Sequence, residues 1–258
     1  MFQKIKSFVR YFLLRKTKYS IHSPFVFDFM IQCLKTPIPK TEFSKFITYR
    51  NSYLNSKELI SVTDFGAGSQ IFNSHKRKVK DIASIAGMSL SKAKIMFKLI
   101  QYFNPNSILE IGTSIGISTG LFKIAGSNVA ITTLEGCPQT AQKAGDFFKL
   151  NHFEKITQVI GEFTQTLPKV IETQKFDWVY FDGNHRKDPT LQYFETCLEI
   201  AQNHTLFIFD DIHWSKEMEY AWEIICKHPM VTVSIDLYDL GLIFFRKEST
   251  KQHFILKK

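Results

Sequence analysis

Three aspartates follow two apolar segments at points where strands are expected to end. Asp182 closes FDWVYFD (176–182), and Asp210 and Asp211 lie together in IFDDIHW. Because parallel strands end at the same edge of a sheet, we expect the three carboxylates to converge there. Converging carboxylates repel each other unless a cation compensates their charge. Asp182, Asp210 and Asp211 are therefore predicted ligands of Mg²⁺, which can also hold a substrate hydroxyl; helix caps that bind water are the structural alternative.

Two histidines near these aspartates are candidates for a general base. His185 lies three residues after Asp182, and His213 lies two residues after Asp211. A neutral imidazole is suited to take a proton from a hydroxyl near pH 7. We favour His185 and keep His213 as its competitor. A histidine without a catalytic role is the alternative in both cases.

Two glycine-rich segments could each form the strand-to-helix loop that holds a cofactor: DFGAGS (64–69) and Gly112–Gly116 within ILEIGTSIGISTG (108–120). Only the second leads directly into a helical pattern and has a later strand that ends in an acid, Glu135. Such a carboxylate can take both hydroxyls of a ribose. The first segment is therefore expected to be a structural turn. The second lacks the G-x-G-x-x-G spacing of dinucleotide-binding loops, which disfavours a nicotinamide cofactor.

The elements that must position these residues alternate regularly from residue 107 onward. Short apolar or β-branched runs predict strands, and amphipathic stretches predict helices between them. This alternation predicts an α/β fold with a Rossmann-like, doubly wound and mostly parallel sheet. VTVSIDL (231–237) and GLIFFRK (241–247) are predicted to form a C-terminal antiparallel hairpin. The expected strands are 107–112, 129–135, 156–160, 176–182 and 205–210, and the expected helices lie near 91–103, 116–125, 138–151, 162–173, 189–203 and 215–228.

The N-terminal part differs from this domain in charge. Residues 1–106 carry a net charge of +13 and residues 107–245 a net charge of −8, within a total of +9. A basic helix is predicted at the start, with one apolar face. That face could pack on the acidic part of the chain or lie on an anionic membrane. We favour packing on the protein, with the N-terminal part as a cap that helps to enclose the substrate. The residues of this face are Phe2, Ile5, Phe8, Val9, Phe12 and Leu13.

The predicted organisation is a basic, mainly helical N-terminal extension (1–88), a Rossmann-like domain (89–248) and a basic tail (249–258). The hydrophobic content of 44% is sufficient for a core. No apolar run approaches the ~20 residues that span a bilayer. The four cysteines show no CxxC spacing, which indicates a reducing compartment, and we expect a cytoplasmic protein. These cysteines are Cys33, Cys137, Cys197 and Cys226.

In order along the chain, the second glycine segment, Glu135, FDWVYFD and the final hairpin resemble a class I S-adenosylmethionine-dependent methyltransferase. The pattern Leu109-Glu110-Ile111-Gly112-x-x-x-Gly116-x-Ser118 is similar to that of the small-molecule O-methyltransferases of the catechol and caffeoyl-CoA kind. The Asp-Asp pair at 210–211 is more similar to bacterial sugar O-methyltransferases of the macrocin type. The catechol-type enzymes place a lysine where His185 stands, which leaves the identity of the base open.

The resemblance implies how S-adenosylmethionine would be held. Glu110 and Gly112 would border its methionine part, and Ser118 would meet its carboxylate at a helix N-terminus. Glu135 would bind the ribose. Glu162 stands where the family has a residue near the adenine, with an acid in the first turn of a helix as the structural alternative. The predicted cofactor site comprises Glu110, Gly112, Thr113, Ser114, Gly116, Ser118, Glu135, Glu162 and Asp182.

These features predict an S-adenosylmethionine-dependent O-methyltransferase that acts on a small-molecule hydroxyl with the help of Mg²⁺. The alternative is a catalytically inactive binding module that keeps the cofactor fold and uses its basic arm on nucleic acid or membrane. For the enzyme, nucleic acid is not an expected partner. Peripheral membrane contact through the N-terminal helix stays open.

Overall fold

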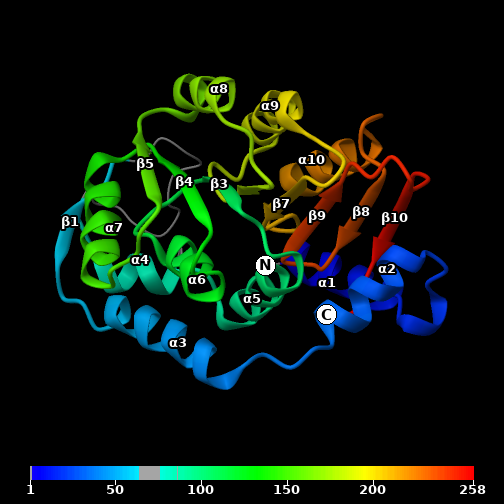
Figure 1. Cartoon of the computed structure of the whole chain (residues 1–258), viewed down its shortest axis with the longest axis horizontal. Coiled ribbons are helices and arrows are strands. Elements are labelled where there is room, and N and C mark those ends of the chain that lie inside the picture. Colours follow the sequence, from blue (N-terminus) through cyan, green and yellow to red (C-terminus); the bar gives the residue numbers. More distant parts are fainter. Residues whose placement is uncertain (1, 64–75, 86) are drawn as a thin grey trace.

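A mixed sheet forms the centre of the computed structural model, which describes residues 2–63, 76–85 and 87–258 (Figure 1). Within these residues the sheet has the strand order β10-β8-β9-β7-β6-β3-β4-β5. Strands β3 to β7 run parallel, and β9 runs antiparallel to both β7 and β8. The predicted doubly wound sheet with its C-terminal hairpin is confirmed. The strands are β3 (Ser107–Ile111), β4 (Ala130–Glu135), β5 (Ile156–Ile160), β6 (Trp178–Phe181), β7 (Leu206–Asp210), β8 (Val233–Asp236), β9 (Leu240–Phe244) and β10 (Gln252–Ile255).

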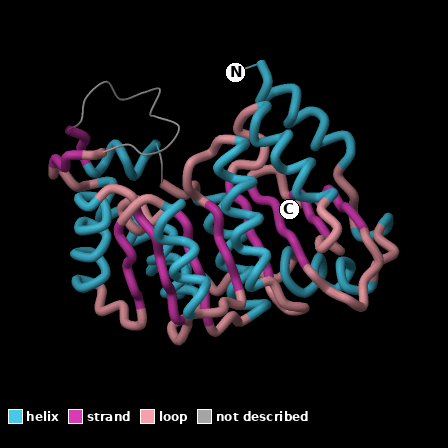
Figure 2. The backbone as a smooth tube through the Cα atoms, turned by 90° about the horizontal axis from the view of Figure 1, so that it is seen from above, coloured by secondary structure: helices cyan, strands magenta, loops and turns pink. Residues whose placement is uncertain are grey.

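Helices cover both faces of the sheet (Figure 2). Successive side chains of a strand point to opposite faces, so each strand contributes to two cores. In β3, for example, Ile108 joins the core beneath α5, α6 and α7, and Leu109 joins the core beneath α8, α9 and α10. The six helices are α5 (Leu90–Phe103), α6 (Ile117–Ala125), α7 (Pro138–Leu150), α8 (Phe163–Thr173), α9 (Lys187–Cys197) and α10 (Lys216–Lys227).

Much of the N-terminal part adds a layer outside α5 and α6, and in Figure 1 α3 runs alongside α6. Phe29 and Phe46 of this layer are fully buried in the same core as α5 and α6. No helix among the described residues is long and apolar enough to cross a membrane. The elements are α1 (Phe2–Leu14), α2 (Pro24–Asp28), a π-helix (Phe29–Leu34), α3 (Lys40–Leu54), α4 (Val79–Ile85) and the antiparallel strands β1 (Leu59–Ser61) and β2 (Lys76–Lys78); two 3₁₀ turns span Lys18–Ser20 and Leu198–Ile200.

The C-terminal residues extend the sheet, which the sequence did not indicate. Strand β10 pairs in parallel with β8 and forms the edge beyond the hairpin. Lys16 forms an isolated bridge with Leu256, and its N–H donates to the Ile255 carbonyl at 2.7 Å. The segment that follows α1 therefore lies beside the C-terminal strand.

The first glycine segment, DFGAGS, lies outside the described residues. The residues just before it are described, and the Thr63 N–H donates to Cys137 Sγ at 3.3 Å. Cys137 comes two residues after Glu135. Thr63 therefore lies close to the end of β4.

Candidate active site

The loop between β3 and α6 uses backbone conformations that favour glycine. Gly112 has φ 107°, Ser114 has φ 50° and Gly116 has φ 87°. A Cβ atom at Gly112 would lie 2.8 Å from the carbonyl oxygen of Asp182, because the ends of β3 and β6 approach closely there. Helix α6 begins directly after Gly116, so its first backbone N–H groups lie at this loop. Such a loop can receive a polar or anionic part of a cofactor.

Glu135 ends β4 beside this loop and is held by two backbone N–H groups. Its Oε2 accepts from the Ser114 N–H at 2.7 Å, and its Oε1 accepts from the Cys137 N–H at 2.9 Å. Burial raises the pKa of Glu135, and these hydrogen bonds oppose that shift. Each carboxylate oxygen has a further lone pair, so Glu135 can accept from two adjacent hydroxyls such as those of a ribose.

Glu110 lies beneath the loop and is fully buried. It accepts hydrogen bonds from the hydroxyls of Ser118 (2.5 Å), Thr119 (2.5 Å) and Thr133 (2.6 Å). Burial raises the pKa of Glu110 to about 7, although the three hydroxyls favour the ionised form. The Thr113 hydroxyl in turn lies 2.5 Å from that of Thr133. These contacts fix the first turn of α6 to β3 and β4, and a direct contact of Glu110 or Ser118 with the cofactor stays a prediction.

Glu162 lies at the next strand end, as the N-cap residue of α8 after β5. Its side chain is exposed, and Oε2 accepts from Gln165 Nε2 at 3.4 Å. The preceding Gly161 donates its N–H to the Glu135 carbonyl at 2.9 Å. The N-cap position agrees with the structural alternative for Glu162. Because Glu162 also lies beside the end of β4, its role near the adenine stays a prediction.

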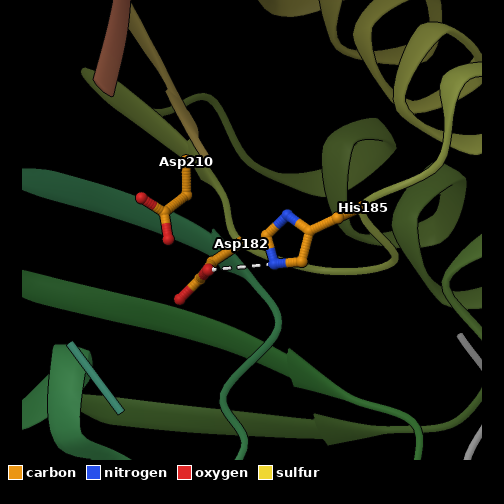
Figure 3. A group of neighbouring side chains, drawn as sticks. All are labelled: Asp182, His185 and Asp210. Carbon is orange, nitrogen blue, oxygen red and sulfur yellow. Dashed lines mark ion pairs between the residues drawn. The ribbon is translucent and has the colours of Figure 1, made fainter. Parts of the chain in front are cut away.

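The carboxylate cluster lies at the ends of β6 and β7, which are neighbours in the sheet. Ligand atoms of Asp182, His185 and Asp210 lie within 4.8 Å of one another. In Figure 3, His185 reaches from the loop after β6 toward Asp182, with Nε2 3.6 Å from Oδ1. Asp211, next to Asp210, has φ 52°. Non-glycine residues in this conformation cost energy and concentrate at functional sites.

A lysine from α5, which the sequence did not single out, reaches into this cluster. Lys92 Nζ lies 2.6 Å from Asp210 Oδ1, 2.7 Å from Asp210 Oδ2 and 2.9 Å from Asp211 Oδ1. Its side chain is only 10% exposed. Burial lowers the pKa of Lys92, but Asp210, Asp211 and Asp182 outweigh burial and raise it, so the side chain is an ammonium. The cluster therefore contains a cation supplied by the chain.

The same cluster alters the acid–base state of Asp182. Burial raises the pKa of Asp182 well above its usual range, and the charge of Asp210 raises it further. The ammonium of Lys92 opposes this shift without cancelling it. Asp182 therefore keeps its proton to a higher pH than an ordinary aspartate.

Mg²⁺ does not fit the cluster as these side chains are arranged. It binds carboxylate oxygens at about 2.0–2.1 Å in octahedral geometry and needs their lone pairs. Both oxygens of Asp210 and one oxygen of Asp211 already face the ammonium of Lys92. A divalent cation beside that ammonium would be repelled. Metal binding would require the Lys92 side chain to leave.

The two candidate bases differ in their surroundings. Both ring nitrogens of His213 face carboxylates: Nδ1 lies 3.0 Å from Glu219 and Nε2 lies 2.8 Å from Asp236. Burial lowers the pKa of His213, but these two acids outweigh burial and raise it. His213 also lines a cavity of about 530 Å³ with Tyr11 of α1 and other residues. Because both ring nitrogens of His213 are engaged by acids, His185 remains the better candidate for the base.

A tyrosine of the N-terminal layer supports the glycine loop. Tyr49 of α3 donates its hydroxyl to the Gly116 carbonyl at 2.8 Å and lies 2.6 Å from the Tyr53 hydroxyl. A Cβ atom at Gly120 would lie 2.1 Å from the Tyr49 ring, so α3 and α6 pack closely. Nothing in the sequence linked the extension to this loop.

Comparisons with known proteins agree with this geometry. Residues 109–212 match a family model described as a methyltransferase domain. The structure resembles the SAH-bound methyltransferase PaMTH1 of Podospora anserina, with 15% identity, a TM-score of 0.60, and coverage of 88% of this chain and 97% of that one. It also resembles the O-methyltransferase TomG of Streptomyces achromogenes in complex with SAM, with 16% identity, a TM-score of 0.55, and coverage of 85% of this chain and 95% of that one. An O-methyltransferase of Bacillus cereus in complex with SAH is similar too, with 18% identity, a TM-score of 0.52, and coverage of 85% of this chain and 97% of that one. No curated protein matches the sequence.

The chain therefore has the fold of the class I S-adenosylmethionine-dependent methyltransferases. The part that matches the methyltransferase-domain model, residues 109–212, runs from β3 to just beyond β7 and so contains the glycine loop and the carboxylate cluster. The fold implied by the resemblance of the glycine loop, Glu135 and the hairpin is confirmed.

Proposed function

We propose that this chain transfers the methyl group of S-adenosylmethionine to a hydroxyl oxygen of a small molecule. The observation that carries the proposal is the shared edge of β4, β3, β6 and β7, which are neighbours in the sheet. The glycine loop and Glu135 lie at the ends of β3 and β4, and the charged cluster lies at the ends of β6 and β7. This is the edge at which ligands bind in open α/β sheets.

The chain's own groups fit the cofactor at the β3 and β4 ends. Glu135 would accept from the ribose hydroxyls, and Gly112, Thr113, Ser114 and Gly116 would border the methionine part. The start of α6, with Ser118, would receive its carboxylate. When bound, S-adenosylmethionine supplies an activated methyl group. Glu110 holds the loop from below, and Glu162 lies on the adenine side.

On the acceptor side, His185 would remove the proton of the attacking hydroxyl. Its place beside Asp182 orients the imidazole, and neutral imidazole is suited to this task near pH 7. Asn184, the preceding residue, has φ 53°, and its buried Oδ1 has no hydrogen-bond partner among the described residues. A hydroxyl of the acceptor would satisfy that oxygen. Catalysis then depends mainly on holding the two reactants in line.

Assistance by Mg²⁺, which the sequence predicts, remains the alternative for the charged cluster. It requires Lys92 to withdraw from Asp210 and Asp211. The inactive binding module is not favoured, because a buried cation among three carboxylates at the cofactor edge is costly to maintain without a role.

The function is tested by measuring S-adenosylhomocysteine release with catechols, sugars and lipid headgroups, each with Mg²⁺ and with chelator. We expect product with at least one hydroxyl compound and none with its O-methylated form. Binding of S-adenosylmethionine without turnover on every class would support the binding module instead. Failure to bind the cofactor would overturn the proposal.

A further inference from the structure

The position of Lys92 in α5 is unusual for a helix. Ser89 caps the helix, and its Oγ accepts from the Lys92 N–H at 3.2 Å, which places Lys92 at the third helical residue. An acidic residue is preferred there, because it answers the N-terminal end of the helix dipole and completes a capping box. The first turn of α5 contains no acid. Helix stability therefore does not explain a lysine at this position.

Burial adds a second cost to a lysine at position 92. The ammonium of Lys92 is removed from water, and such a charge is tolerated only when it is paired and hydrogen-bonded. Its partners are Asp210, with a side chain 6% exposed, and Asp211, with a side chain 28% exposed. The hydrogen bonds to Asp210 Oδ2 and Asp211 Oδ1 use two of its three N–H donors. Asp210 Oδ1 also lies 2.6 Å from Nζ, so any further acceptor at the site would share the third donor with this oxygen.

We propose that the ammonium of Lys92 is the permanent cation of this carboxylate cluster, so that the chain binds no divalent metal there and transfers methyl groups without one. The ammonium compensates Asp210 and Asp211, as a metal would, and its third N–H holds the acceptor oxygen beside His185. The catalytic part of this inference rests on the proposed function. The part that concerns metal binding does not.

Manganese binding tests the inference without any turnover. Mn²⁺ is titrated into the wild-type chain, Lys92→Ala and Lys94→Ala, and free Mn²⁺ is measured by electron paramagnetic resonance. Lys94 lies on the exposed side of the same helix, so its variant loses an equal charge elsewhere. We expect binding at this site only in Lys92→Ala, because that variant leaves the carboxylates uncompensated. Saturable Mn²⁺ binding by the wild type that is lost in Asp210→Asn would overturn the proposal.

Activity supplies the second readout. The wild type should be equally active in chelator and in Mg²⁺, and Lys92→Arg should keep this metal independence because it keeps the charge. In chelator, Lys92→Ala should lose about 100-fold in kcat, the scale of losing one charged donor at a reacting oxygen, and Mg²⁺ should restore part of it. Loss of wild-type activity in chelator would overturn the proposal. So would full activity of Lys92→Ala in chelator.

Two outcomes separate this inference from the proposed function. If no acceptor is methylated under any condition, the proposed function fails while the Mn²⁺ titrations still decide whether Lys92 excludes metal. If Lys92→Ala does not fold, Mn²⁺ binding by the wild type and the activity of the wild type and Lys92→Arg in chelator still test the inference. Methyl transfer that requires metal would leave the function standing and remove the role of Lys92.

A second, independent observation concerns the outer face of α1. Among residues 5–14 of this helix, whose side chains the structure describes, Ser7 and Tyr11 are buried, and the Tyr11 hydroxyl donates to the Leu256 carbonyl at 2.6 Å. The sequence favoured packing of the apolar face on the protein; Phe8 does contact the Tyr238 ring, but most of the described part of this face is exposed. Its exposed side chains are Ile5 (55%), Phe8 (48%), Val9 (49%), Phe12 (51%) and Leu13 (74%).

Cations border this outward face. Lys6 and Arg10 lie one helical turn apart along one side, and the Arg15 guanidinium lies 3.8 Å from the centre of the Phe12 ring. The first acidic residue of the chain is Asp28. An apolar face bordered by cations matches an anionic lipid surface, whereas a second copy of this chain would bring further cations against it. We infer that α1 docks the protein on an anionic membrane surface.

Sedimentation with vesicles tests this docking. The wild type should sediment with vesicles that contain phosphatidylglycerol and not with pure phosphatidylcholine, and binding should weaken as salt rises. Val9→Ser with Leu13→Ser should abolish sedimentation, whereas Leu150→Ser, which changes an apolar side chain 72% exposed on α7, should not. No binding to anionic vesicles would overturn the inference. A wild-type dimer that the α1 variant dissociates, without vesicle binding, would assign the face to a second copy instead.

Discussion

Replacement of Glu135 by alanine is expected to weaken the binding of S-adenosylmethionine strongly. Glu135 is held by the N–H groups of Ser114 and Cys137, so its two oxygens are already oriented before the cofactor arrives. A hydrogen bond to a charged group contributes about 1.5–3 kcal/mol. The loss of two such bonds, offset by water that enters the free site, gives an expected change of about 2–3 kcal/mol, or roughly 30- to 150-fold in Kd.

Calorimetric titration of the cofactor into wild type and Glu135→Ala measures this change. Glu154→Ala, an exposed acid that follows α7, is the control for the loss of one negative charge and should bind as the wild type does. Thermal unfolding without cofactor distinguishes a weakened site from a disrupted fold. An unchanged Kd in a folded Glu135→Ala variant would refute the assignment of Glu135 to the ribose.

Three further predictions concern the support of this site. Burial raises the pKa of Glu110 from 4.5 to about 7, so the free energy of unfolding should fall as pH rises through this window and level off above it. In urea unfolding, the wild type should lose about 3 kcal/mol of stability between pH 4.5 and 7 relative to Glu110→Gln, and parallel pH profiles of the two proteins would contradict this. Gly112→Ala would place a Cβ atom 2.8 Å from the Asp182 carbonyl oxygen in a backbone with φ 107°, so urea unfolding should show a destabilisation of about 1–3 kcal/mol or more. A variant as stable as the wild type would show that β3 and β6 do not approach so closely. Tyr49→Phe removes the hydroxyl that donates to the Gly116 carbonyl and should lower both stability and cofactor affinity by about 1–3 kcal/mol, measured by denaturation and calorimetry. An unchanged affinity would show that α3 does not support the cofactor loop.

The sheet domain could be predicted because its elements carry strong local patterns. Strand β6 is a continuous apolar run and β7 is one up to its final Asp210, as expected for strands buried on both faces, and each predicted strand appears. Strand β10 could not be foreseen, since Gln252–Ile255 is short and lies among charged residues. Its pairing depends on β8 presenting an open edge, which is a property of the assembled fold.

The site could be predicted in outline from the strand ends. Parallel strands bring Glu135, Asp182 and Asp210 to one edge whatever the details of the side chains. The position of Lys92 could not be predicted, because a lysine in a helix usually lies on a solvated face and only the packing of α5 directs it inward. The one local signal was a lysine three residues after the cap Ser89, where an acid is preferred. The buried state of Glu110 likewise depends on hydroxyls from α6 and β4 that meet only in the folded chain.

We propose that the edge formed by the glycine loop and Glu135 binds S-adenosylmethionine for methyl transfer. Calorimetric titration of the wild-type chain with S-adenosylmethionine, repeated after saturation with S-adenosylhomocysteine or with NAD⁺, tests it most directly. We expect saturable binding of one cofactor per chain that S-adenosylhomocysteine abolishes and NAD⁺ leaves unchanged. No heat of binding, or competition by NAD⁺, would contradict it.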